Sequence, residues 1–289
     1  MVEATGIDVH DLTKRFGDKI AVDHLTFSVT PGRVTGFLGP NGAGKSTTMR
    51  LILGLDRPQS GTATIGGRAY AQISKPLETV GALLEARSVH TGRSARNHLL
   101  YLAQTQGLPA RRVDEVLDLV GLRAVARKRA GGFSLGMSQR LGIAVAMLGD
   151  PRVLLLDEPA NGLDPEGIRW IRTLMQGLAS EGRTVLVSSH LMSEMALTAD
   201  HLIVIGRGKL IAGAGGTVKP EEARNGSEPP ADEGVASLVV TGLQAPRIGE
   251  LAASSSVVLY ELTPQQASLE EAFMELTADS VEYGRQETP

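Results

Sequence analysis

The chain has 289 residues, of which 42% are hydrophobic and 21% are charged, so it can bury the core of one large domain and hold a smaller unit besides. Its formal charge of −3 argues against the broad basic field of a nucleic-acid-binding protein, and we expect no nucleic-acid partner. The absence of cysteine excludes disulfides, thiolate zinc sites and cysteine nucleophiles, and it fits a reducing compartment.

No segment of the sequence is predicted to cross a membrane. The N-terminus carries early acidic residues and no apolar core of signal-peptide length. The longest apolar runs, such as VLLL and TVLV, are strand-sized and far shorter than the ~20 residues of a membrane helix. We therefore expect a chain that is soluble when isolated, and another protein must supply the spanning part of any membrane function.

Residues 1–214 alternate short β-branched runs with longer helical patterns, which predicts an α/β domain. Helical periodicity dominates from about Ala86 to Ala130 and a further helix follows, so we predict a mainly helical insert at about 86–150. The predicted elements are strands at 7–12, 24–29 and 33–38, helices at 48–55, 95–107, 111–122 and 138–149, a strand at 152–159, a helix at 165–182 and a strand at 184–190.

The composition changes after the α/β domain. Glycine, proline and acidic residues dominate residues 215–234, which is typical of a flexible linker with little to bury. Beyond the linker, residues 235–289 have the pattern of a small β-α-β-α module. We therefore predict three units: the α/β domain, the linker and an α+β accessory module.

The run GPNGAGKST matches the pattern G-x-x-x-x-G-K-[ST], with Gly39, Gly44, Lys45 and Ser46 at the defined places. It lies between a predicted strand and a predicted helix, where small residues let backbone N–H groups close around phosphate oxygens. Lys45 would neutralise the β- and γ-phosphates, and the hydroxyl of Ser46 would ligate Mg²⁺. The alternative is an ordinary glycine turn. The residues predicted to contact the nucleoside triphosphate are Gly39, Pro40, Asn41, Gly42, Ala43, Gly44, Lys45, Ser46 and Thr47.

The run VLLLDEP is an apolar strand that ends in two adjacent carboxylates, which is costly unless the charges have a role. At the carboxyl end of a strand they would lie beside the phosphate loop. We predict that Asp157 holds Mg²⁺, directly or through water, and that Glu158 polarises the attacking water. The alternative is an acidic turn after a strand.

A second helix start in the run FSLGMSQR also has the features of a phosphate site. Ser134 and Gly136 would lie at a helix N-terminus, where anions bind. One nucleotide needs one such cradle in each chain, so this second cradle indicates a nucleotide held by another subunit.

These motifs, followed by NGLD and VLVSSH in the same order, resemble the ATP-binding subunit of ABC transporters over residues ~5–214. The resemblance implies a P-loop NTPase of the ABC type with a helical insert subdomain. It also implies a homodimer that holds two ATP molecules head to tail. Each ATP would lie between the P-loop of one chain and the signature segment FSLGM of the other.

The resemblance assigns further roles by position. Phe16 resembles the aromatic residue that stacks on adenine, and the alternative is a core phenylalanine. Asp164 resembles the aspartate that links the two sites across the dimer. His190 resembles the histidine that contacts the γ-phosphate and holds the water, and the alternative is a structural histidine.

Two positions depart from the family pattern. Leu135 stands where the usual signature has glycine, and Glu85 stands where a Mg²⁺-sensing glutamine is usual. A carboxylate can ligate Mg²⁺ or its water, so Glu85 is predicted to contact the metal. Both departures resemble the subgroup that serves bacterial drug, bacitracin-type antibiotic and ABC-2-type exporters. The run SLEEAFMELT resembles the C-terminal ending of that subgroup, and the alternative is a plain amphipathic helix.

The resemblance implies the ATPase of an exporter, with ATP and Mg²⁺ as cofactors and an ABC-2-type membrane permease as partner. It would lie peripherally at the cytoplasmic face of the membrane and serve drug or antibiotic resistance. One alternative is a soluble ABC ATPase of translation or DNA maintenance, which the single P-loop and short insert disfavour. Another is an ATP-responsive regulatory subunit with little turnover, which Glu158 and His190 disfavour.

Overall fold

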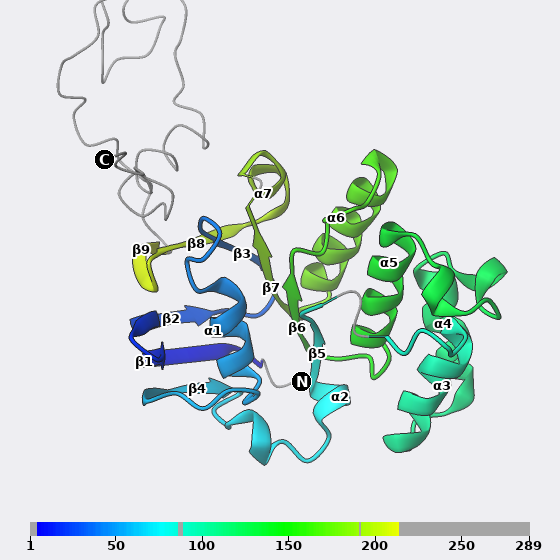
Figure 1. Cartoon of the computed structure of the whole chain (residues 1–289), viewed down its shortest axis with the longest axis horizontal. Helices are drawn as coiled ribbons and strands as arrows, with labels where there is room; N and C mark the ends of the chain where they lie inside the picture. Colours follow the sequence, from blue (N-terminus) through cyan, green and yellow to red (C-terminus); the bar gives the residue numbers. More distant parts are fainter. Residues whose placement is uncertain (1–4, 86–88, 191, 214–289) are drawn as a thin grey trace, which may run out of the picture.

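The computed structural model describes residues 5–85, 89–190 and 192–213 of the chain (Figure 1). These residues form two sheets and a set of helices. The strands are β1 Ile7–Phe16, β2 Lys19–Val29, β3 Val34–Leu38, β4 Ser60–Ile65, β5 Val80–Leu83, β6 Val153–Asp157, β7 Thr184–Ser189, β8 His201–Gly206 and β9 Lys209–Gly213. The α-helices are α1 Lys45–Ile52, α2 Pro76–Thr79, α3 Ala95–Thr105, α4 Ala110–Leu119, α5 Leu135–Ala146, α6 Pro165–Ser180 and α7 Met192–Thr198. Short 3₁₀ turns occupy Tyr70–Gln72, Arg123–Val125 and Ala130–Gly132.

A six-stranded sheet of order β5-β6-β7-β3-β8-β9 forms the centre of the domain. Its first five strands are parallel and β9 is antiparallel. The strands β3, β6 and β7 are buried along their whole length, because they are near-continuous apolar runs covered on both faces.

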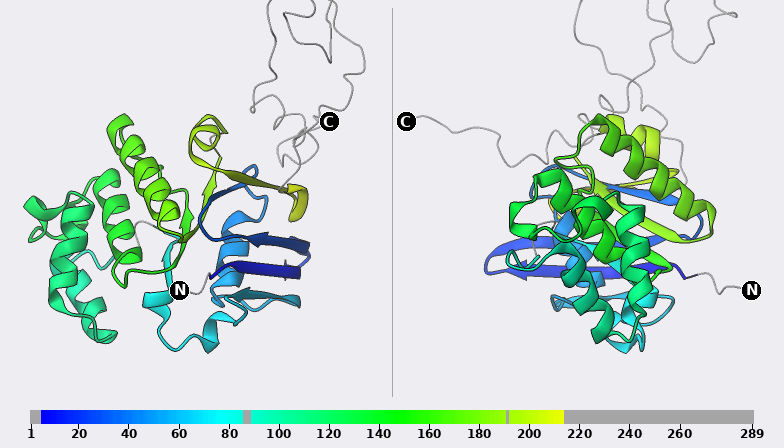
Figure 2. Two further views of the ribbon diagram at one scale, coloured as in Figure 1. Left: turned by 180° about the vertical axis from the view of Figure 1, so that it is seen from behind. Right: turned by 90° about the vertical axis from the view of Figure 1, so that its right-hand side faces the viewer.

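The two faces of the central sheet pack against different layers. In β6, Leu154 and Leu156 join a core with α3, α4, α5 and α6, whereas Val153 and Leu155 join a core with α1 and the three-stranded sheet β2-β1-β4. This division follows from the alternation of side chains along a strand. Figures 1 and 2 show the helices on one side of the central sheet, and α1 with the antiparallel sheet on the other.

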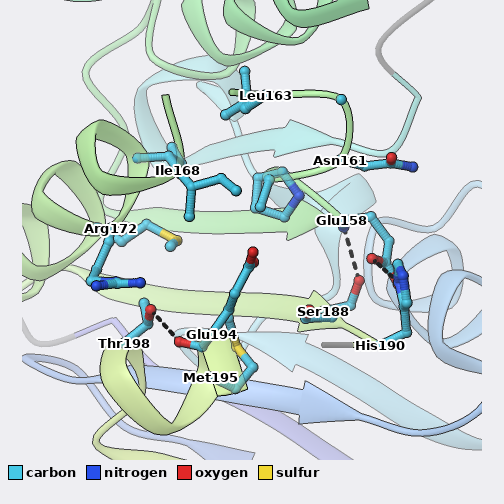
Figure 3. Close-up of a pocket in the computed structure, with 16 residues that line it drawn as sticks. Glu158, Asn161, Leu163, Ile168, Arg172, Ser188, His190, Glu194, Met195 and Thr198 are labelled. Atoms are coloured by element: carbon cyan, nitrogen blue, oxygen red, sulfur yellow. Dashed lines mark hydrogen bonds and ion pairs between the residues drawn. The ribbon is translucent and has the colours of Figure 1, made fainter. Parts of the chain in front are cut away.

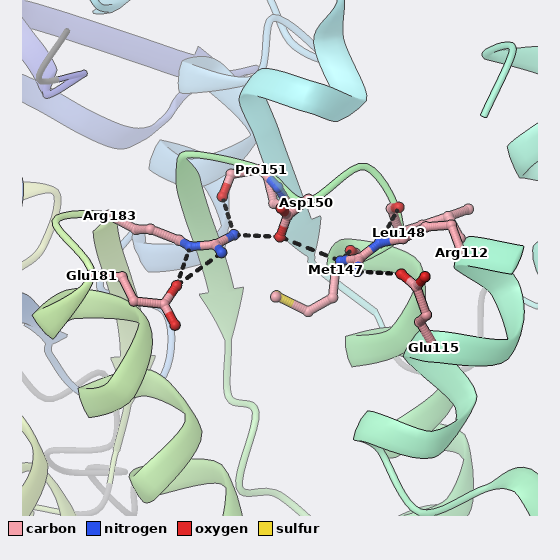
Figure 4. A network of polar contacts seen from close by, with 8 residues as sticks. All are labelled: Arg112, Glu115, Met147, Leu148, Asp150, Pro151, Glu181 and Arg183. Atoms are coloured by element: carbon pink, nitrogen blue, oxygen red, sulfur yellow. Dashed lines mark hydrogen bonds and ion pairs between the residues drawn. The ribbon is translucent and has the colours of Figure 1, made fainter. Parts of the chain in front are cut away.

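A network of ion pairs links the helical insert to the central sheet at the amino ends of its strands (Figure 4). From α4, Arg112 donates to the carbonyl oxygens of Met147 and Leu148 at 2.9 and 3.1 Å. Asp150 lies 3.3 Å from the guanidinium of Arg112 and 2.8 Å from that of Arg183, which precedes β7. Asp150 therefore links the helical insert to the central sheet at the amino ends of the strands. The carboxyl ends, on the opposite edge of the sheet, are left for a functional site.

The strand register gathers the chemistry-bearing segments at the carboxyl edge of the sheet. Asp157 at the end of β6 pairs with Ser188 of β7, and Leu38 at the end of β3 pairs with Ser189. The loop after β3, the carboxylates after β6 and the histidine after β7 are therefore neighbours, as parallel strands require.

The predicted α/β layering is confirmed, and each predicted strand and helix within residues 5–190 corresponds to an observed one. The helix predicted at 138–149 begins earlier, at Leu135, because Ser134 caps it. The strands β4, β5, β8 and β9 were not predicted; β4 is a largely exposed run without the apolar pattern of a buried strand. The predicted linker, the accessory module and SLEEAFMELT lie outside the described residues, so the domain boundaries stay predictions.

Candidate functional site

The loop between β3 and α1 is packed so closely that two of its positions require glycine. A Cβ atom on Gly39 would lie 2.4 Å from the carbonyl oxygen of Ile205, and one on Gly44 would lie 2.4 Å from that of Ala21. Gly44 also has a φ of 105° and caps α1, a backbone conformation that other residues rarely adopt. The loop is therefore a preformed backbone cradle at a helix N-terminus.

A cavity of about 380 Å³ opens over this loop. Its wall is formed by the end of β1, the start of β2, the glycine loop and the end of β6. The lining residues are Phe16, Lys19, Ala21, Asn41, Gly42, Ala43, Gly44, Lys45, Ser46, Thr47, Asp157 and Glu158. The structure thus brings together most of the residues that the sequence motifs indicated.

Phe16 is an exposed aromatic residue at the rim of this cavity. Its side chain is 52% exposed at the end of β1, so the alternative of a core phenylalanine is wrong. The ammonium group of Lys14 lies 5.0 Å from the centre of its ring, and Lys14 also donates to the carbonyl oxygen of Arg57 at 2.7 Å. The ring remains available to a flat ligand group.

Lys45 places a buried cation at the base of the cavity. Its side chain is 7% exposed, and its Nζ donates to the carbonyl oxygens of Gly39 and Pro40 at 2.6 and 3.3 Å. Burial lowers the pKa of Lys45, while the carboxylates of Glu158 and Asp157 oppose that shift. Its Nζ lies 4.0 Å from Oε1 of Glu158. A buried ammonium whose ion pair with Glu158 is this long favours an anionic ligand.

The end of β6 is tied to β7 through one hydroxyl group. The Oγ of Ser188 donates a short hydrogen bond to Oδ1 of Asp157 and accepts one from the backbone N–H of Glu158 at 3.0 Å. This leaves Oδ2 of Asp157 free of any hydrogen bond that the structure shows among residues 5–85, 89–190 and 192–213. Ser188 therefore fixes the carboxylate of Asp157 and the backbone of Glu158, although the sequence motifs did not single it out.

Glu158 is held in an unusual conformation. Its φ is 49°, in the left-handed region that costs a non-glycine residue about 1 kcal/mol. The amide of Gln139 on α5 donates to its carbonyl oxygen at 2.9 Å, and the Nδ1 of His190 lies 2.7 Å from its Oε2 (Figure 3). Since the carboxylate accepts this bond, Nδ1 carries the proton. His190 thus orients the carboxylate, while Gln139 and Ser188 hold the backbone of Glu158. Gln139 is a second contact that the motifs did not reveal.

The other predicted residues lie apart from this cavity. Ser134 caps α5 by accepting from the N–H of Met137 at 3.2 Å, and Asp164 caps α6 by accepting from the N–H of Gly167 at 2.8 Å. Gly136 follows in the first turn of α5, and Glu85 follows β5. None of these four borders the cavity over the loop.

A second, smaller cavity lies behind Glu158 and His190. It measures about 190 Å³ and is bordered by the loop 160–163, by α6 and by α7 (Figure 3). Its walls are largely apolar, and the Nε of Arg172 is buried there without a hydrogen-bond partner in the part of the chain that the structure describes.

The oxygen donors at the first cavity fit Mg²⁺ bound together with phosphates. No group of three or more histidine, aspartate or glutamate side chains is placed to hold a metal within the described ranges. The side chains of Ser46 and Asp157 both border the cavity. Mg²⁺ keeps several waters and takes phosphate oxygens, so it needs only one or two protein oxygens.

Comparison with known proteins places the chain in a family. The model of the family described as "ABC transporter" matches residues 22–161. The bacitracin transport ATP-binding protein BcrA of Bacillus licheniformis is 45% identical over 211 residues, which cover 72% of this chain and 69% of that protein. The chain belongs to the ATP-binding subunits of ABC transporters. The predicted resemblance, including its bacitracin-type subgroup, is confirmed.

Other relatives extend this assignment. The uncharacterized ABC transporter ATP-binding protein YhcH of Bacillus subtilis is 35% identical over 300 residues, which cover 96% of this chain and 98% of that protein. The lantibiotic transport ATP-binding protein SrtF of Streptococcus pyogenes is 35% identical, covering 71% of this chain and 89% of that protein. A second family model, a domain of unknown function, matches residues 208–270.

The fold agrees with solved members of the family. A structure described as the ATP-binding subunit of an ABC transporter has a TM-score of 0.66 and 28% identity, and it covers 72% of this chain and 89% of that one. The predicted P-loop NTPase fold is confirmed, and the ABC ATPase subunit binds and hydrolyses ATP. No helix among the described residues has the length and apolarity to cross a membrane.

Proposed function

We propose that this ATPase subunit powers export through a separate ABC-2-type membrane permease, as a homodimer that closes around two ATP molecules. One observation carries the proposal: the phosphate-loop cavity is built by one part of the chain, whereas the signature segment at Ser134 lies apart from it. The relatives named for bacitracin transport, lantibiotic transport and Nod factor export support export as the direction.

The loop 39–47 binds the phosphates in this proposal. Its backbone N–H groups and the N-terminus of α1 surround the phosphate oxygens, and Lys45 exchanges its bonds to loop carbonyls for the β- and γ-phosphates. Ser46 and Asp157 would hold Mg²⁺, with Glu85 acting on the metal or its water. The metal would neutralise phosphate charge when bound. Phe16 stacks on the adenine ring.

Glu158 and His190 act on the attacking water. The carboxylate of Glu158 accepts a proton as the water oxygen bonds to the γ-phosphorus and the bond to the bridging oxygen of ADP breaks. The hydrogen bond from His190 holds this carboxylate in one orientation. Because Glu158 is also fixed through its backbone by Ser188 and Gln139, it needs little reorganisation to react.

The signature end serves the nucleotide of the partner subunit. Ser134 and Gly136 present the N-terminus of α5, a 12-residue helix, to the γ-phosphate of the ATP that the other chain holds. Asp164 lies at the end of the loop that leaves Glu158, so it links one nucleotide site to the other. Each complete site then requires two chains.

Membrane fractionation tests the coupling to a permease. Cells that express this chain with and without a candidate ABC-2-type permease are separated into membrane and soluble fractions, and the chain is quantified in each. We expect it in the membrane fraction only with the permease present, with ATPase activity that the permease changes. A chain that stays soluble in both, or sediments with ribosomes or DNA, would overturn the exporter assignment in favour of a soluble ABC ATPase.

A further inference from the structure

Leu135, the first residue of α5, packs its side chain against the backbone of Gly162. A Cβ atom on Gly162 would lie 2.3 Å from Cδ2 and 2.4 Å from Cγ of Leu135. Gly162 has a φ of 75°. The branched end of Leu135 therefore fills the space where residue 162 would otherwise carry its own side chain. Leu135 is still 41% exposed, so the contact with Gly162 covers only part of its side chain.

The rest of the loop 160–163 also lies on the first turn of α5. A Cβ atom on Gly136 would lie 3.1 Å from the carbonyl oxygen of Gly162 and 3.7 Å from Cδ2 of Leu163. The loop connects Glu158, whose carbonyl oxygen accepts from the N–H of Asn161 at 3.1 Å, to Asp164, the cap of α6. A displacement of the loop would therefore move both of these acidic residues.

One side of the same loop borders unfilled space. All four of its residues border the cavity of about 190 Å³, together with apolar side chains such as Ile168, Met175 and Met195 (Figure 3). A loop beside unfilled space loses dispersion contacts on that side. Leu163 packs against the core and close to Gly167 of α6. The contact between Leu135 and Gly162 is therefore what fixes the middle of the loop to α5.

We propose that Leu135 is a positioning residue for ATP hydrolysis. It clamps the loop 160–163 to α5 and so holds Glu158 and Asp164 in fixed positions relative to the N-terminus of α5. The usual signature, with glycine at this place, has no side chain to make this contact. The effect on turnover rests on the proposed role of Glu158, whereas the clamp itself is a packing property that can be measured without nucleotide.

Two measurements on three variants test the clamp. Amide hydrogen exchange of the loop is followed on the nucleotide-free protein, and kcat and ATP affinity are measured separately. For Leu135→Gly we expect exchange at 161–163 to rise roughly tenfold, because the loop opens more often. We expect kcat to fall by about tenfold, with ATP affinity within about twofold of wild type, because the loop positions the reacting carboxylate without binding the phosphates. Leu135→Met conserves the side-chain volume, so its amide exchange at 161–163 and its kcat should stay close to those of wild type.

The second arm uses Gly162→Ala. The new methyl group collides with Leu135, so this variant alone should lose about tenfold in kcat. In the double variant Leu135→Gly with Gly162→Ala, the methyl group has room, so the double variant should lose no more in kcat than Leu135→Gly alone and the two losses should not multiply. Gly67→Ala is the matched control, because Gly67 has a φ of 73° and no atom within 4 Å of an added Cβ. It reports the backbone strain alone.

The outcomes separate the clamp from the proposed function. Unchanged exchange in Leu135→Gly, or a double variant in which the two single losses multiply, would overturn the clamp. A loss in Gly67→Ala equal to that in Gly162→Ala would also overturn it, because backbone strain would then suffice. If the wild-type chain and its Glu158→Gln variant turned over ATP equally, the proposed role of Glu158 would fail, and the exchange measurements would still decide the clamp.

Discussion

The phosphate-loop end and the signature end of the domain are built differently. At the first, the side chain of Glu158 faces that of Lys45 and contacts that of His190. The backbone N–H of Glu158 also donates to Ser188. At the second, Ser134 and Asp164 each satisfy the N–H groups of their own helix. The phosphate-loop end is thus assembled inside one chain, while the signature end makes only local bonds and leaves Leu135 exposed. This difference favours a site completed by a second chain.

Glu158→Gln should break the chemistry of the phosphate-loop end while keeping its geometry. The amide matches the carboxylate in size but does not accept the proton of water, so turnover should fall by a factor of ~100 or more. ATP affinity should stay within a few-fold, and an ATP-bound dimer should accumulate on size exclusion. Phosphate release measures the turnover. Glu166→Gln on the exposed first turn of α6 is the control, and full turnover in Glu158→Gln would remove this residue from its role.

Lys45→Ala should weaken ATP binding itself. The variant removes the buried ammonium at the base of the cavity, and charge-assisted hydrogen bonds of ~1.5–3 kcal/mol correspond to roughly a 10- to 100-fold loss of affinity. Equilibrium binding of a fluorescent ATP analogue measures this. Lys75→Ala removes an exposed lysine that is paired with Glu78 at 3.0 Å and should bind as wild type does. Equal affinities for wild type and Lys45→Ala would contradict the cradle.

The phosphate-loop end could be predicted from sequence because its residues follow strands directly. Asp157 ends β6, His190 follows β7, and Lys45 begins α1 after the glycine loop that leaves β3. Parallel pairing brings the carboxyl ends of these strands together. Ser188 and Gln139 escaped prediction because their contacts depend on strand register and on the packing of α5 against the sheet. Neither dependence leaves a local pattern in the sequence.

The contacts of the signature end were less predictable. The sequence showed that Leu135 departs from the usual signature. Its contact with Gly162 was not predicted, because the two residues are far apart in the sequence. The edge strand β4 was missed because it is largely exposed and lacks the apolar pattern of a buried strand. Sequence motifs thus locate the reacting groups better than the packing that holds them.

Ser134→Arg should separate the two ends of the domain. If Ser134 serves the nucleotide of the partner chain, a bulky guanidinium there should weaken ATP-driven dimerisation by roughly tenfold or more, since it must be buried in the closing interface. ATP binding by the monomer should change by less than about twofold, because Ser134 is not part of the loop cavity. The dimer is measured by size exclusion in the Glu158→Gln background. Ser134→Ala controls for the lost helix cap, and a Ser134→Arg monomer that binds ATP as poorly as Lys45→Ala would contradict the two-chain site.

Phe16→Ala should give the smallest effect, at the rim of the phosphate-loop end. The ring is exposed, with Lys14 near one face, and aromatic stacking of ~0.5–1.5 kcal/mol predicts an affinity loss of roughly two- to tenfold. Phe16→Tyr keeps the ring and should bind ATP as wild type does, whereas Phe16→Leu keeps apolar area and should lose the stacking.

Inorganic triphosphate, which has no base, should bind equally to wild type and Phe16→Ala. Competition of ATP and triphosphate against a fluorescent nucleotide measures both affinities. A Phe16→Ala variant that lost triphosphate binding as strongly as ATP binding would show that Phe16 shapes the phosphate loop and does not contact the base.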